Sequence, residues 1–185
     1  NKVISYLGSA NFYDSLDGGQ VDGVRAIRQP GSTLKPLLYA LGIDKGLITP
    51  KMIIEDVPIN YNGYTPENYD RNFYGLVSMS DALGQSLNVP AVKMLHQMGP
   101  KALIEKLIDC EFDQIKKDRN KLGLSLTLGG CGTSLEELTA LFALFARDGK
   151  YVRPQYVLTK DTNTYSKQII SPSSSFMITD ILSQI

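Results

Sequence analysis

Ser32 and Lys35 stand three residues apart in the stretch RQPGSTLKPLLYALGIDKG, residues 28–46. Four leucines follow with the spacing of one apolar helical face: Leu34, Leu37, Leu38 and Leu41. The pattern predicts a buried helix that begins at about Ser32 or Thr33 and ends near Gly46. Because residues three apart share a helical face, the hydroxyl and the amine should lie on the same side of it.

This pair of side chains could carry out acyl transfer without a histidine. A serine hydroxyl is a weak nucleophile until a base removes its proton. A lysine amine can act as that base where burial lowers its pKa toward neutrality. The N–H groups at a helix start would stabilise the negative charge that develops on oxygen. The competing interpretation is that Ser32 caps the helix and Lys35 is a solvated charge.

A second hydroxyl and an amide occur in the tripeptide SLN, as Ser86 and Asn88. Facing Ser32, they could relay a proton and hold a substrate carbonyl; alternatively, Asn88 simply ends a helix before Val89 and Pro90. S-x-x-K followed by S-x-N provides the first two of three motifs found in penicillin-binding proteins and class A β-lactamases.

The cysteines offer a different nucleophile. Cys131 lies in GGCGTS, and His96, the only histidine, could be its base. A small apolar residue in a tight turn is the favoured interpretation of Cys131, and His96 is expected to pack or to lie at the surface. Two cysteines, Cys110 and Cys131, provide neither a disulfide framework nor metal-ligand spacing, so we expect no metal or cofactor. A bridge between them is left open.

Composition narrows the function classes further. The chain has 185 residues, of which 43% are hydrophobic and 21% charged, with 19 basic and 19 acidic side chains. Because the charges balance, the chain has no net positive electrostatic field that would favour binding to nucleic acid or to an anionic membrane. No apolar run is long enough to span a bilayer, and the sequence does not open with a signal peptide.

The remaining elements follow from turn and cap residues. We predict strands at 2–8 and 151–159, the second interrupted by Pro154, a loop at 9–23, a short extended piece at 24–27 and an irregular segment at 48–77. We predict helices at 81–88 capped by Ser80, at 90–99, at 100–110, from a Ser134/Glu137 capping box to Gly149, and from 173 to the last residue, Ile185.

Longer strings resemble a known family. RQPGSTLKPLLYALGIDKGLITP (28–50) and YTPENYDRNFYGLVSMSDALGQSLNVPAVKML (64–95) resemble the transpeptidase module of class A bifunctional penicillin-binding proteins, especially the 1C subtype. LTLGGCGTSLEELTALFALFARDGKYVRP (126–154) resembles the segment that follows there. The likeness extends from about Lys2 to Tyr156.

The resemblance implies an α+β fold with a five-stranded antiparallel sheet between helices, a mostly helical lobe and an active site in the cleft. It implies that Ser32 attacks the D-Ala–D-Ala bond of a peptidoglycan stem peptide, that Lys35 is its base, that Ser86 passes a proton to the leaving amine, and that Asn88 positions Lys35 and the substrate amide. An amine would then resolve the acyl-enzyme, and β-lactams would trap it. The expected location is the periplasmic face of the bacterial inner membrane.

One feature of the family is missing. Its third motif, Lys-Thr-Gly or Lys-Ser-Gly on an edge strand, does not occur in the sequence. We therefore expect a partial transpeptidase domain, inactive or nearly so alone, with the C-terminal strands, the glycosyltransferase domain and the membrane anchor outside it. Its parts would be 1–31 (strands and loop), 32–150 (nucleophile helix and helical lobe) and 151–185 (strand and truncated helix). An open sheet edge would favour a homodimer.

Two alternatives share the fold. A β-lactamase would need a base, such as Glu67 in TPENYD, to activate the deacylating water. A sensor or binding module for β-lactams would form the adduct without crosslinking.

Overall fold

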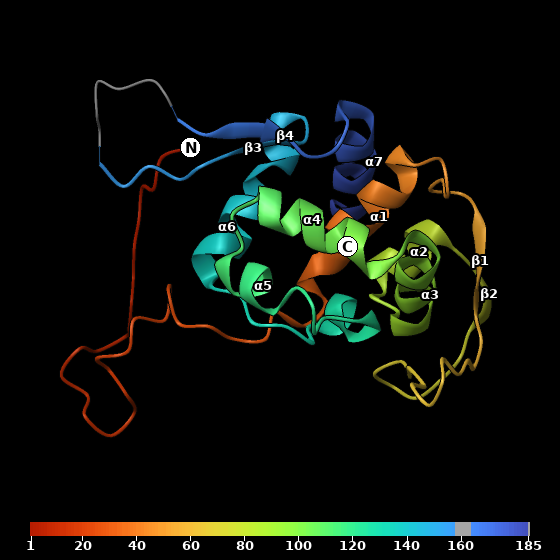
Figure 1. The fold of residues 1–185 in the computed structure, drawn as a ribbon, viewed down its shortest axis with the longest axis horizontal. Helices are drawn as coiled ribbons and strands as arrows, with labels where there is room; N and C mark the ends of the chain where they lie inside the picture. The colour runs from red at the N-terminus through yellow and green to blue at the C-terminus, as the bar shows by residue number, and fades with distance from the viewer. Residues whose placement is uncertain (158–163, 185) are drawn as a thin grey trace.

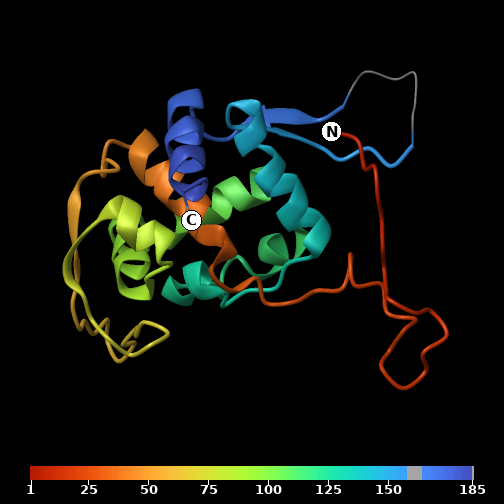
Figure 2. The ribbon, with the colours of Figure 1, turned by 180° about the vertical axis from the view of Figure 1, so that it is seen from behind.

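The helix predicted after the Pro-Gly pair lies at the centre of the molecule (Figures 1 and 2). The computed structural model describes residues 1–157 and 164–184. This helix, α1 (Lys35–Asp44), is preceded by the 3-10 turn η1 (Gly31–Leu34). It is buried from Lys35 to Gly42, on all sides rather than along one stripe. Gly46, at φ +67°, follows its end as predicted.

Helices surround α1, and short strands lie at the periphery (Figure 1). The other α-helices are α2 (Met79–Gly84), α3 (Asn88–Met98), α4 (Pro100–Asp109), α5 (Asp113–Asp118), α6 (Leu135–Ala143) and α7 (Pro172–Leu182). Two more 3-10 turns are η2 (Leu124–Leu128) and η3 (Phe145–Arg147). Helix α1 packs against α2, α3, α4, α7 and η2, so one core holds these elements together.

The strands form two separate antiparallel pairs. β1 (Ile53–Asp56) pairs with β2 (Gly75–Ser78), and β3 (Lys150–Val152) pairs with β4 (Ser166–Gln168). Within β1, Asp56 is buried, whereas Ile53 and Glu55 face outward, as the two-residue period of a strand requires. The prediction of an entirely irregular segment at 48–77 was therefore wrong at its two ends. The α+β class is confirmed.

The predicted N-terminal strand at 2–8 is wrong. Its one β-bridge within the described residues joins Lys2 to Gln155, and Ile4 is 96% exposed. A strand needs a partner along several residues, and this segment meets one at a single point. Residues 23–26 form a turn rather than an extended piece, and the bridge lies at Arg28, opposite Thr133. The loop at 9–23 is confirmed.

The helix boundaries differ from the predicted ones by a few residues. Ser78, not Ser80, caps α2, because its hydroxyl accepts from the Asp81 N–H. Helix α3 begins at Asn88, two residues before the proline expected to open it. The capping box of α6 is confirmed, whereas β3 already ends at Val152. Residues 158 and 159 of the predicted strand lie outside the described part.

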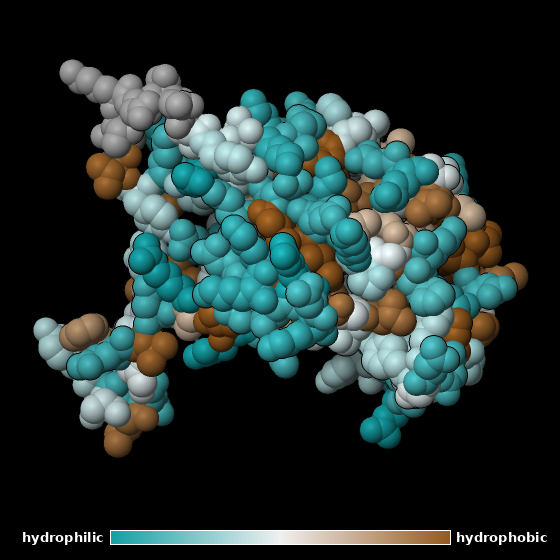
Figure 3. Space-filling model, viewed as in Figure 1, coloured by the Kyte–Doolittle hydropathy of each residue, from teal (hydrophilic) through white to brown (hydrophobic). Residues whose placement is uncertain are grey.

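Exposed apolar side chains gather at the β1–β2 hairpin and on the N-terminal segment, while much of the helical face in Figure 3 is hydrophilic. Ile53 is 57% exposed and Leu76 is 73% exposed. None of the helices within residues 1–157 and 164–184 is long and apolar enough to cross a membrane.

Candidate active site

Lys35 is a buried lysine with three hydrogen-bond acceptors. Its side chain is 1% exposed. Nζ donates to the Ser86 carbonyl oxygen at 2.6 Å, to Asn88 Oδ1 at 2.7 Å and to Ser86 Oγ at 3.2 Å. The interpretation of Lys35 as a solvated surface charge is therefore wrong. The structure brings together three of the four residues singled out in the sequence.

Ser86 occupies an unusual backbone position. Its φ is +54°, in the left-handed region where glycine is the common residue. The Ser86 N–H donates to the Leu83 carbonyl and the Leu87 N–H to the Ala82 carbonyl, at 2.9 Å each. This is the Schellman arrangement that ends α2. The turn leaves the carbonyl and the hydroxyl of Ser86 both bonded to the Lys35 amine.

Asn88 is the first residue of α3, and its side-chain amide is bonded at both ends. Oδ1 accepts from Lys35, and Nδ2 donates to the Glu67 carbonyl at 2.8 Å. The Asn88 backbone N–H donates to Asn68 Oδ1 at 2.7 Å. Sequence reasoning missed Asn68. The available signal was Leu87, an N-cap residue without a capping side chain, which requires a cap from elsewhere in the chain.

Ser32 lies in η1, three residues before Lys35 and half-buried. It caps neither η1 nor α1, whose N-cap residues are Pro30 and Leu34. Its neighbour Thr33 instead donates through its hydroxyl to the Pro30 carbonyl at 3.0 Å. Among the residues described, no hydrogen bond engages Ser32 Oγ. The Lys35 backbone N–H donates to the Ser32 carbonyl, but the two side chains are related by helical spacing and not by a direct bond.

A glycine-rich segment supports the turn that carries Ser32. Arg28 and Thr133 exchange two backbone hydrogen bonds, at 2.8 and 2.9 Å. Gly129, at φ +90°, lies so close that a Cβ there would stand 2.4 Å from the Gly31 nitrogen. The segment GGCGTS therefore acts as a close backbone support, for which glycine is required.

Burial lowers the pKa of Lys35 to about 8. The cause is the loss of hydration, which destabilises the charged ammonium relative to the neutral amine. About one molecule in ten of a group with this pKa is unprotonated at pH 7. The arrangement can thus supply a base one helical turn beyond a serine hydroxyl.

The structure does not support Cys131 as a nucleophile with His96 as its base. Cys110 and Cys131 are both free thiols. Burial raises the pKa of Cys131 to about 11, which disfavours the thiolate that a nucleophilic cysteine needs. His96 is exposed and stacks on Tyr61, with ring centroids 4.3 Å apart. Within the described ranges, no group of three potential metal ligands occurs.

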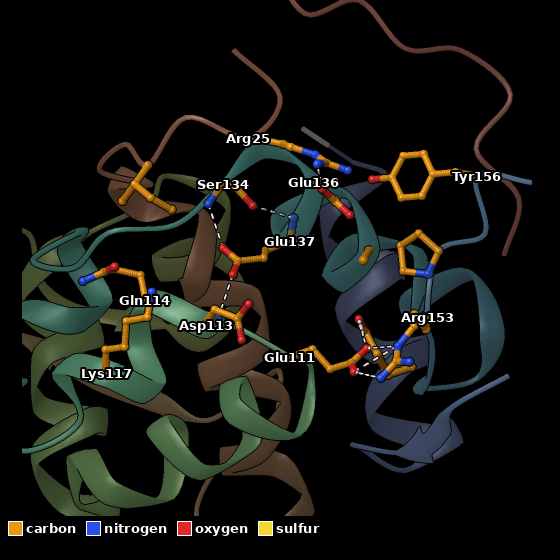
Figure 4. A pocket seen from close by; sticks show the side chains of 14 residues that line it. Arg25, Glu111, Asp113, Gln114, Lys117, Ser134, Glu136, Glu137, Arg153 and Tyr156 are labelled. Carbon is orange, nitrogen blue, oxygen red and sulfur yellow. Dashed lines mark hydrogen bonds and ion pairs between the residues drawn. The ribbon is translucent and has the colours of Figure 1, made fainter. Parts of the chain in front are cut away.

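A cleft of about 550 Å³ opens elsewhere, beside α5, α6 and β3 (Figure 4). Three of its acidic residues, Glu111, Glu136 and Glu137, have partners. Glu137 accepts from the backbone N–H groups of Asp113 and Ser134, and Glu111 pairs with Arg153. The lining includes none of the four candidate residues, and these pairs stabilise helix starts and a loop. Glu137 is thus a first-turn helix acid, as predicted.

The similar proteins found by comparison belong to one family. The model of the penicillin-binding protein transpeptidase domain matches residues 19–185. Penicillin-binding protein 1C of Escherichia coli is 38% identical over 181 residues, which cover 98% of this chain and 23% of that protein. Penicillin-binding protein 1F of Bacillus subtilis is 34% identical, with 88% and 24% covered. The chain spans about a quarter of the length of these relatives.

Solved structures share the fold. A peptidoglycan glycosyltransferase from Burkholderia ambifaria superimposes with a TM-score of 0.74 at 18% identity, over 87% of this chain and 57% of that one. The PonA1 protein of Mycobacterium tuberculosis, in complex with penicillin V, gives a TM-score of 0.74 at 19% identity, over 86% and 48%. The family model and the curated relatives together establish that this chain belongs to the penicillin-binding protein transpeptidase family.

Proposed function

We propose that this chain carries part of the active site of a peptidoglycan D,D-transpeptidase, with Ser32 as the nucleophile. The observation that carries the proposal is the buried Lys35 amine, bonded to Ser86 and Asn88 and set one turn from Ser32. Its lowered pKa suits a base that works near neutral pH.

In the proposed reaction, the neutral Lys35 amine takes the proton of Ser32 as Oγ attacks the carbonyl carbon of the penultimate D-Ala. The tetrahedral intermediate collapses with cleavage of the C–N bond. The leaving D-Ala amine receives a proton from the Ser86 hydroxyl, which Lys35 reprotonates through their hydrogen bond. An acceptor amine on a neighbouring stem peptide then attacks the ester, forms the crosslink and returns Ser32 to its free state.

A β-lactam would acylate the same hydroxyl by opening its ring. The leaving nitrogen stays attached to the acyl group, so it remains in the site. Peptidoglycan stem peptides and β-lactams are therefore the proposed ligands. The proposed location is the outer face of the bacterial inner membrane, where these ligands occur.

The proposal includes a statement about the 185 residues alone. The sequence contains no Lys-Thr-Gly or Lys-Ser-Gly, the motif that supplies an oxyanion donor in the family. Loss of one oxyanion donor costs about 10²–10³ in rate. We therefore expect these residues to be nearly inactive by themselves and active within the full-length protein.

The test is labelling of the full-length protein with a fluorescent penicillin, followed by mass spectrometry of the labelled peptide. We expect one adduct on Ser32, lost in Ser32→Ala and retained in Thr33→Ala, which removes the neighbouring hydroxyl. Labelling that survives Ser32→Ala would show that Ser32 is not the nucleophile. Rapid turnover of a chromogenic cephalosporin would favour a β-lactamase. A stable adduct without crosslinking of peptidoglycan strands would favour a sensor.

A further inference from the structure

A buried carboxylate lies behind the residues that bind Lys35. Asp56, at the end of β1, is 0% exposed. Its two oxygens accept from Asn68 Nδ2 at 2.9 and 2.8 Å, and Oδ2 also accepts from the Tyr74 backbone N–H at 2.9 Å. A buried carboxylate is tolerated only where donors surround it, so these contacts fix the hairpin and the loop to each other.

Asp56 and the Asn72 carbonyl together determine which way the Asn68 amide faces. The NH₂ end of Asn68 donates to both Asp56 oxygens and, at 2.9 Å, to the Asn72 carbonyl oxygen. The oxygen end therefore points toward α3, where it accepts from the Asn88 N–H at 2.7 Å and lies 3.4 Å from the Val89 nitrogen. Asn68 itself is 4% exposed.

Asn68 thus supplies the N-terminal cap that α3 lacks. Helix starts have unsatisfied N–H groups, and Leu87, in the N-cap position, cannot accept from them. The preceding residue adds a second contact, because the Glu67 carbonyl accepts from Asn88 Nδ2. The backbone and the amide nitrogen of Asn88 are both held by residues 67–68. The other end of its side chain, Oδ1, accepts from the Lys35 amine.

We propose that Asp56 and Asn68 are positioning residues for acyl transfer, acting on Lys35 through Asn88. The inference rests on the proposed function of the Ser32 site. Hydrogen bonds link the Asp56 carboxylate to the Asn68 amide, the Asn68 amide to the Asn88 backbone N–H, and the Asn88 side chain to the Lys35 amine. Asp56 and Asn68 come from β1 and from the loop between β1 and β2, so the hairpin sets the geometry of a base located on α1.

A purely structural role would have a different signature. If the two residues only fixed the loop, their replacement would reduce the folded fraction without changing the chemistry of folded molecules. If they position Asn88, Lys35 loses an acceptor that favours its ammonium form, and the pH midpoint of acylation moves down. The acylation rate of folded protein falls as well, because the amine is no longer held in place.

The experiment uses the full-length protein in four forms: Asp56→Asn, Asn68→Asp, the double exchange of both, and Asp70→Asn as a control. Asp70 lies in the same loop and accepts from Asn72 and Tyr74, which also contact Asn68 and Asp56, so this variant tests the loop without removing a hydrogen bond of the two proposed residues. The acylation rate constant by a fluorescent penicillin is measured against pH for each variant. Thermal melts report the folded fraction.

Asn68→Asp places two carboxylates together, and we expect acylation to fall about 10²-fold. The lower pH midpoint is expected for Asp56→Asn, because that exchange adds no carboxylate. The double exchange restores a donor opposite an acceptor and should recover about tenfold of that loss. Asp56→Asn should be intermediate, and Asp70→Asn should match the wild type.

Two outcomes would overturn the inference. One is wild-type acylation in folded Asp56→Asn and Asn68→Asp proteins. The other is a double-exchange protein no better folded and no more active than Asn68→Asp. Failure of the proposed function would be distinct, because the wild-type protein would then carry no label on Ser32.

Discussion

The Lys35 amine is buried among acceptors that carry no full negative charge. Its three partners are two carbonyl oxygens and one hydroxyl. An adjacent carboxylate would hold the ammonium form, whereas here burial lowers the pKa to about 8. The site therefore favours proton acceptance over ion pairing, the property that a base for Ser32 requires.

The pH dependence of acylation follows from this pKa. In the proposed mechanism the neutral amine is the active form, so the acylation rate constant of the full-length protein should rise with pH with a midpoint near 8. At pH 6, about one molecule in a hundred carries the neutral amine. Stopped-flow measurement of penicillin acylation between pH 5.5 and about 9.5 would test this.

Lys35→Arg is the matched variant for that profile. The guanidinium keeps the charge but cannot give up its proton in this range. We expect acylation to fall about 10²–10⁴-fold, the usual contribution of a general base. A Lys35→Arg protein that retains the wild-type rate and midpoint would show that Lys35 is not the base.

Ser86 illustrates a conflict between stability and chemistry at one residue. Its φ of +54° costs a side chain about 1 kcal/mol that glycine avoids. We therefore expect Ser86→Gly to raise the free energy of unfolding relative to Ser86→Ala by about 1 kcal/mol. Both variants lack the hydroxyl and should acylate more slowly. Urea denaturation with parallel labelling would test both parts, and equal stability of the two variants would contradict the strain argument.

At the scale of elements, the position of Ser32 depends on a neighbouring turn. Gly129 approaches Gly31 so closely that any side chain would push against the backbone of η1. We expect Gly129→Ala to shift η1 and to reduce acylation about 10²-fold in the full-length protein. The loss of stability should exceed the cost of the positive φ alone.

Gly46→Ala provides the control for this effect. Gly46 also has a positive φ, of +67°, but no heavy atom lies within 4 Å of a Cβ built there. This variant should lose only about 1 kcal/mol of stability and keep its acylation rate. Differential scanning calorimetry and labelling compare the two. Equal effects of Gly129→Ala and Gly46→Ala on acylation would show that Gly129 does not position η1.

The predictable and unpredictable parts of the site differ in their physical origin. Helix α1 follows from local spacing and turn residues, and S-x-x-K and S-x-N mark Lys35, Ser86 and Asn88 directly. The chain from Asp56 through Asn68 depends on contacts between residues distant in sequence, which no local pattern specifies. The predicted strand at 2–8 was wrong for the same reason, because within the described residues its β-forming residues make a β-bridge only at Lys2.

At the scale of the molecule, the β1–β2 hairpin combines an inner face with a buried carboxylate and an outer face with exposed apolar side chains. Its inner side carries Asp56, which anchors the loop beside Lys35. Its outer side presents Ile53 and Leu76, 57% and 73% exposed. Only two strands form this sheet within the part of the chain that the structure describes, so each strand keeps one unpaired edge there. Unpaired edges with apolar faces favour association with another strand.

We therefore expect the 185 residues, prepared alone, to self-associate through this hairpin. The apparent mass in sedimentation velocity should increase with concentration, and Ile53→Lys combined with Leu76→Lys should suppress the increase, because charges on an exposed strand oppose pairing. Phe176→Lys on α7 is the control, since Phe176 is 72% exposed but lies outside the hairpin. A monomer at all concentrations, or suppression by the Phe176 variant alone, would contradict association through the sheet edge.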